Sequence, residues 1–174
     1  MSRTKGAALP IAYVTLRILI IVNWVYGAAV LGLVVFANSR PAWFMRAIDV
    51  PAGMDPKPIM IGLTAIATLG LLAVPLNHLI LTRLLRMVKT VSRGDPFIRA
   101  NAYRLNAIAW ALLALQLLSM VIGGIGKAIA SKQFPLHLDA GFSTSGWLAV
   151  ILTFVLARVF AEGALMREDL EGTV

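Results

Sequence analysis

Four long apolar stretches with almost no charge decide what this chain can fold into. They cover about residues 18–37, 59–81, 105–126 and 142–160, and Arg158 is their only Asp, Glu, Lys or Arg. A helix crosses the roughly 30 Å hydrocarbon core of a bilayer with about 20 such residues. Lipid offers no hydrogen bonds to irregular backbone, so spanning segments of this kind must be helical. The sequence therefore predicts an all-α fold, a polytopic four-helix membrane bundle forming a single domain over residues 1–174.

The composition supports this class and excludes others. Hydrophobic residues make up 59% of the 174 and charged residues 14%, whereas about a quarter of a soluble domain is charged. Cysteine is absent, which excludes disulfides and thiolate metal sites. The net charge of +8 is typical of loops that face anionic lipid, so we expect the bilayer, and not nucleic acid, as the direct partner.

The basic residues predict the orientation. With four spans, eleven Lys and Arg residues fall on the side that holds both termini and the middle loop, against five on the other. The positive-inside rule then places both termini and the middle loop in the cytoplasm, in an inner (cell) membrane. Trp43, Phe44 and Trp147 suit the outer interface, where aromatic rings settle.

The middle loop predicts a helical hairpin. An apolar stripe continues past residue 81, so the second helix should project beyond the membrane. Gly94 suits the left-handed position that ends a helix. Asp95 and Pro96 are favoured as the N-cap and the first residue of the next helix, so we expect the third helix to begin there.

The C-terminal segment, residues 161–174, holds four of the eight acidic residues and lies on the same predicted side. One hypothesis is that its carboxylates dock against the basic hairpin; the alternative is a solvated, mobile tail, since exposed ion pairs contribute little. The candidate pairs join Glu162, Glu168 and Asp169 to Arg93, Arg99 and Arg104.

The polar residues within the spans admit two interpretations. Asn23, Asn77 and His78 would line a transport path or proton relay, or else they form hydrogen bonds between packed helices. No Asp or Glu lies in a span, which disfavours ion-coupled transport. Small residues four apart, such as Ala157 and Ala161, allow close helix packing.

The remaining patterns predict no chemistry. The glycines at 123, 124 and 126 should loosen the outer end of the third helix, because no phosphate-binding motif surrounds them. His137 and Asp139 are too few for zinc, which needs at least three protein ligands. We therefore expect no catalytic residues, no metal, no cofactor and no enzymatic activity.

Two stretches carry a family resemblance. The first, the hairpin motif, consists of Arg93-Gly94-Asp95-Pro96-Phe97 with Asn101 and Arg104. The second, the tail motif, runs from Phe160-Ala161-Glu162-Gly163 through Leu165, Glu168-Asp169-Leu170 and Thr173-Val174. Together with the four spans, they resemble a bacterial family of small four-helix membrane proteins of unknown function. The resemblance implies a partner, a Cro/CI-type helix-turn-helix regulator often encoded beside such proteins, and it implies no activity.

Two functional hypotheses follow. In the first, the chain is a non-enzymatic regulatory membrane protein that binds or sequesters a cytoplasmic regulator through the hairpin and the tail. In the second, it is a small transporter or channel with Asn23, Asn77 and His78 on its path. The oligomeric state is left open by the sequence.

Overall fold

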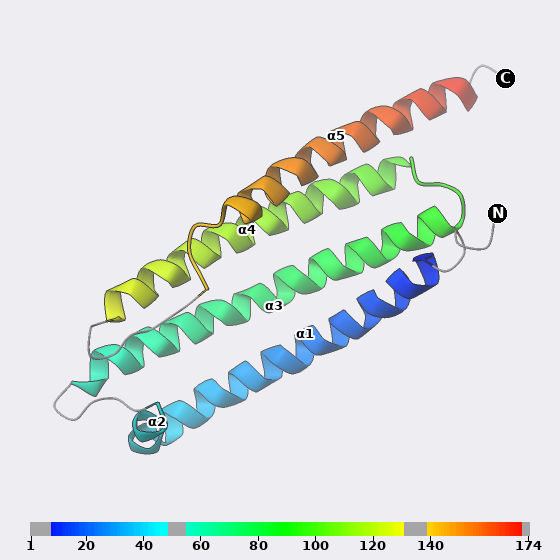
Figure 1. Ribbon diagram of the computed structural model, residues 1–174. Coiled ribbons are helices and arrows are strands. Elements are labelled where there is room, and N and C mark those ends of the chain that lie inside the picture. Colours follow the sequence, from blue (N-terminus) through cyan, green and yellow to red (C-terminus); the bar gives the residue numbers. More distant parts are fainter. Residues whose placement is uncertain (1–7, 49–54, 131–138, 172–174) are drawn as a thin grey trace. The chain divides into compact units, whose positions relative to one another are not determined.

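The described part of the chain is entirely helical. The structure is a computed structural model, and it describes residues 8–48, 55–130 and 139–171. These residues form five helices and no strand (Figure 1): α1 (Ala8–Ser39), α2 (Pro41–Ala47), α3 (Pro56–Ser92), α4 (Arg99–Ile129) and α5 (Thr144–Glu171). Four of them, all but α2, are long and apolar enough to cross a membrane. The all-helical class and the four candidate spans are confirmed.

The four long helices extend beyond the predicted apolar stretches. α1 contains 32 residues and α3 contains 37, so they measure about 48 and 55 Å at the 1.5 Å rise of an α-helix. Both lengths exceed the roughly 30 Å core of a bilayer. α5 continues to Glu171, so most of the segment predicted as an acidic tail is the last part of a long helix.

The short helix α2 was not predicted. Pro41 occupies one of its first positions, where its fixed φ favours a helix and its missing N–H is not needed. Trp43 from α2 packs edge to face on Phe36 of α1, with ring centroids 5.3 Å apart. The two aromatic residues expected in an interfacial loop, Trp43 and Phe44, therefore lie on a helix.

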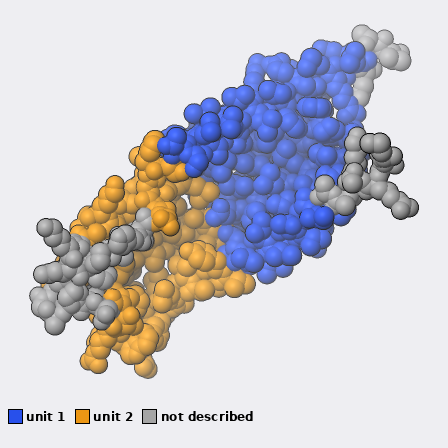
Figure 2. Space-filling model, in the orientation of Figure 1, with its two compact units in different colours: residues 1–23, 76–114, 144–174 blue, residues 24–75, 115–143 orange. Residues whose placement is uncertain are grey.

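The chain divides into two compact units (Figure 2). Unit 1 consists of Met1–Asn23, Leu76–Ala114 and Thr144–Val174, and unit 2 of Trp24–Pro75 and Leu115–Ser143. The helices α1, α3 and α4 contribute to both units, whereas α5 belongs to unit 1. The single domain over residues 1–174 stays a prediction.

The buried side chains of unit 1 are mostly small. Ala109 on α4 and Ala164 on α5 are almost completely buried, while Leu105 and Ile108 add larger apolar groups. Small residues let membrane helices approach closely, where dispersion forces replace the hydrophobic effect as the source of stability. α1, by contrast, exposes most of its large apolar side chains, as expected for a helix that faces lipid.

In unit 2, the segment before α5 folds back along α4. The Gly141 N–H donates to Ser119 Oγ at 3.1 Å, and Gln116 Nε2 donates to the Gly141 carbonyl at 3.5 Å. Ser119 lies ten residues before the end of α4, which corresponds to about 15 Å of helix. Irregular backbone at membrane depth requires protein partners of this kind.

The glycines of α4 do not loosen its end, contrary to the prediction. The helix continues through them to Ile129. A Cβ on Gly123 would lie 2.6 Å from the Ala140 carbonyl oxygen and 2.8 Å from Gly141 Cα. Gly123 is therefore the point where the returning backbone touches α4.

Candidate functional site

The turn between α3 and α4 is a Schellman motif. The Asp95 N–H donates to the Thr90 carbonyl at 3.1 Å, and the Gly94 N–H donates to the Val91 carbonyl at 3.0 Å. Gly94 has φ +89°, a left-handed conformation that residues with a Cβ rarely adopt. The prediction that Gly94 ends the second long helix is confirmed.

The predicted start of the next helix is wrong. α4 begins at Arg99, three residues after Pro96, and Asp95 is not its N-cap. Asp95 instead accepts a hydrogen bond from Arg167 Nη1 at 2.9 Å. Phe97, which lies between the turn and α4, packs its ring against α5. This packing overrides the local preference for a helix that begins at Pro96.

Hydrogen bonds of the Asn101 side chain connect the parts of this turn. Its side chain is completely buried. Its Nδ2 donates to Thr90 Oγ1 and to the Pro96 carbonyl, both at 2.8 Å, and its Oδ1 accepts from Arg104 Nη1 at 2.7 Å. One amide therefore links the end of α3, the connection and the first turn of α4.

The hairpin motif and the tail motif meet in unit 1, and we call their contact the motif interface. The rings of Phe97 and Phe160 lie 5.1 Å apart. Beside them, Phe97 lies against Gly163, where a Cβ would be 2.9 Å from Phe97 Cδ1. Two ion pairs, Arg99–Glu168 and Asp95–Arg167, join the same two segments. Figure 1 shows the α3–α4 connection beside the last turns of α5.

The ion pairs match the docking hypothesis in part. Glu168 pairs with Arg99, as expected, whereas Glu162 pairs with Arg158 on its own helix. Asp95 pairs with Arg167 at 2.9 Å. The sequence did not suggest this pair, because here the hairpin supplies the acidic residue and the tail supplies the basic one. All three pairs are substantially exposed to solvent. Exposed ion pairs add little stability, so their main effect is to orient the side chains that they join.

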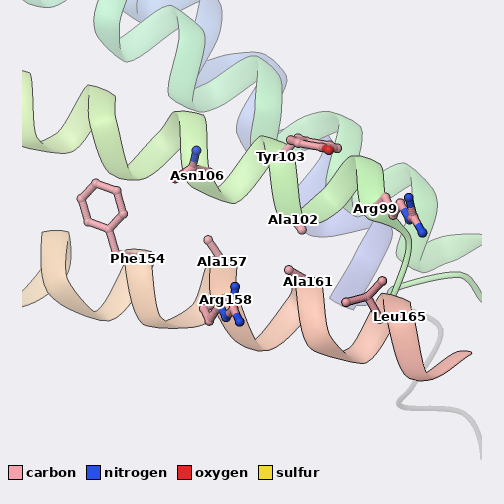
Figure 3. Close-up of a pocket in the computed structure, with 9 residues that line it drawn as sticks. All are labelled: Arg99, Ala102, Tyr103, Asn106, Phe154, Ala157, Arg158, Ala161 and Leu165. Atoms are coloured by element: carbon pink, nitrogen blue, oxygen red, sulfur yellow. The ribbon is translucent and has the colours of Figure 1, made fainter.

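A groove of about 380 Å³ runs between α4 and α5 next to the Arg99–Glu168 pair. In Figure 3, Ala157 and Ala161 point from α5 toward α4, and Ala102 points back from α4. These small side chains leave the space open. The other residues that line the groove are Arg99, Tyr103, Asn106, Phe154, Arg158 and Leu165.

The groove was only partly visible in the sequence. The spacing of Ala157 and Ala161 indicated a close helix contact, and the structure places both in the groove wall. Tyr103, which is exposed at the rim, carried no sequence signal, and Leu165, also exposed there, was noted only as a residue of the tail motif. Their proximity depends on how α4 and α5 are paired, which no local pattern encodes.

The predicted polar residues of the spans lie elsewhere. Asn23 on α1 and Asn77 and His78 on α3 are all half-buried. None of them lines the groove between α4 and α5 or the two further surface grooves of the described residues. The described residues also contain no cluster of potential metal ligands, and His137 lies outside them.

The long apolar helices define the class: the chain is a multi-pass helical membrane protein. It belongs to the family described as protein of unknown function (DUF2975), whose model matches residues 45–174 and so includes both motifs. No curated protein matches the chain, and no solved structure matches it either. The family assignment confirms the resemblance to a small family of unknown function, whereas the pairing with a helix-turn-helix regulator stays a prediction.

Proposed function

We propose that this protein is a non-enzymatic membrane receptor for a cytoplasmic regulator, which docks beside the motif interface in the groove between α4 and α5. The observation that carries the proposal is the position of this groove. It opens where the hairpin motif and the tail motif meet, with the Arg99–Glu168 pair at its rim. The proposal assumes the predicted orientation, in which this end faces the cytoplasm.

The motif residues divide into two groups under this proposal. Asn101, Phe97 and Gly163 make contacts within the protein, so their part is to fix the geometry of the α3–α4 turn against α5. Arg99 is exposed at the rim of the groove. Its guanidinium supplies charge that a partner meets, and such charge sets association rate and specificity.

The groove suits one turn of a partner helix. Its alanine floor accepts an apolar side chain, and the rim offers Tyr103, 71% exposed, and Leu165, 45% exposed, as apolar contacts. Helix-in-groove recognition uses apolar anchors of this kind with charged residues around them. A small helix-turn-helix regulator, which the family resemblance implies as partner, is composed of such helices.

The experiment is co-purification of the full chain in detergent with a Cro/CI-type regulator encoded beside its gene. Ala161→Leu fills the groove, and we expect it to reduce capture of the regulator at least tenfold. Ala149→Leu is the matched control, because Ala149 is an exposed alanine of the same helix outside the groove. Equal capture by both variants would refute docking in this groove, and no capture by the wild type under several detergent conditions would refute the receptor function.

A further inference from the structure

A second groove in unit 1 lies between the first part of α1 and the last part of α3. It has a volume of about 460 Å³. α1 supplies apolar walls with Leu9, Pro10 and Val14 and adds Tyr13, while α3 and the residue after it supply Val88, Lys89, Ser92 and Arg93. One side is therefore apolar and the other is basic, and the described part of the groove contains no acidic residue.

Three cations gather around this groove. Lys89 Nζ lies 5.5 Å from the centre of the Tyr13 ring, and the Arg17 guanidinium lies 5.1 Å from the same ring. Arg93, the residue after the end of α3, lines the same groove as Lys89. None of the three forms an ion pair with a carboxylate among the described residues, whose ion pairs involve Arg99, Arg158 and Arg167 instead. An anion bound between these cations would reduce their mutual repulsion.

The apolar side of the groove continues along α1. Ile11, Val14 and Ile18 are spaced three and four residues apart, and each is more than half exposed. This stripe leads from the basic groove into the apolar part of the helix, which has the length and composition of a membrane span. A ligand that fits both parts has a negative head and a long apolar tail.

We propose that this groove binds the phosphate headgroup of an anionic phospholipid, with the acyl chains along the exposed stripe of α1. The phosphate lies between Lys89 and Arg93, which donate charge-assisted hydrogen bonds to its oxygens. Basic pockets between membrane helices bind lipid headgroups by this chemistry. The site therefore fixes the depth and rotation of α1 and α3 at the membrane surface.

The test is lipid binding by the full chain, purified in detergent and stripped of lipid, followed by native mass spectrometry. Titration with phosphatidylglycerol should give one tightly retained lipid, and phosphatidylcholine should bind much more weakly. Each basic residue near a membrane surface contributes about a fivefold change in binding. Lys89→Ala with Arg93→Ala should therefore weaken phosphatidylglycerol binding about 25-fold, whereas Lys89→Arg with Arg93→Lys should retain most of it.

The matched control is Arg83→Ala with Arg86→Ala, which removes two charges from the same helix outside the groove. Equal losses in the two double variants would overturn the site, because binding would then follow net charge alone. Glycerol 3-phosphate separates the two sources of a phosphate: affinity equal to that of the lipid would also overturn the proposal. Ala161→Leu should leave lipid binding unchanged, so a failure of the receptor function is distinguishable from a failure of this site.

Discussion

Phe97 lies directly against Gly163, so that the ring occupies the space that a side chain at residue 163 would need. A Cβ on Gly163 would come within 2.9 Å of Phe97 Cδ1. The contact joins the hairpin motif to the tail motif. It explains why α4 begins at Arg99 and not at Pro96.

This contact predicts that the effect of Gly163→Ala depends on Phe97. Alanine raises helix propensity by about 1 kcal/mol, whereas overpacking costs about 1–3 kcal/mol. We expect Gly163→Ala to be neutral or mildly destabilising in the wild type, because the ring is 43% exposed and is able to shift. In a Phe97→Ala background, the same change should stabilise the protein. Unfolding free energies in mixed micelles test this sign change, and equal effects in both backgrounds would contradict the contact.

Asn101 should be the most sensitive polar residue of the turn. Asn101→Ala removes both amide donors and leaves the part-buried Pro96 carbonyl without that partner. The loss of such bonds predicts a destabilisation of about 2–3 kcal/mol. Asn101→Asp should also destabilise, because it places a carboxylate oxygen against the Pro96 carbonyl oxygen.

The control for Asn101 is on the same helix. Asn106 is exposed at the groove, so Asn106→Ala should change the unfolding free energy by less than about 0.5 kcal/mol. Similar values for the two alanine variants, measured by the same micelle titration, would show that the buried hydrogen bonds of Asn101 do not hold the turn.

The sequence predicted those features that depend on local chemistry. The four spans follow from apolar length, and the end of α3 follows from Gly94, whose left-handed φ leaves few alternatives. The start of α4 could not be predicted in the same way. Asp95 and Pro96 favour a helix start by local preference, but the packing of Phe97 on α5 decides the backbone there.

The candidate site shows the same limit. Its motifs were visible, and the pairing of Glu168 with Arg99 was among the possibilities drawn from charge alone. The Asp95–Arg167 pair was not among these possibilities. It joins residues 72 positions apart, and each has the opposite charge to most of its segment: Asp95 is acidic in the basic hairpin, and Arg167 is basic in the acidic tail. The groove between α1 and α3 depends on which helices are neighbours, and a single sequence does not state this.

The Asp95–Arg167 pair predicts a small, reversible effect on the end of α5. Asp95→Arg or Arg167→Asp places like charges together and should loosen this end of the helix. The double charge swap should restore the pair. Exposed pairs of this kind are worth about 0–1 kcal/mol, so each single variant should raise the rate of limited proteolysis near Glu168 by up to about fivefold. The rate should return to that of wild type in the swap, and high salt should remove the difference.

Gly123 and Gly124 give the sharpest comparison, because neighbouring glycines of α4 have opposite surroundings. A Cβ on Gly123 would lie 2.6 Å from the Ala140 carbonyl oxygen, which is backbone and moves only with its whole segment. Gly124 is exposed, with nothing within 4 Å of an added Cβ. Gly123→Ala should therefore cost about 1–3 kcal/mol, whereas Gly124→Ala should be neutral or stabilise by up to about 1 kcal/mol through helix propensity. The free energies of unfolding in micelles distinguish the two. If both substitutions stabilised the protein, the segment before α5 would not fold back onto α4.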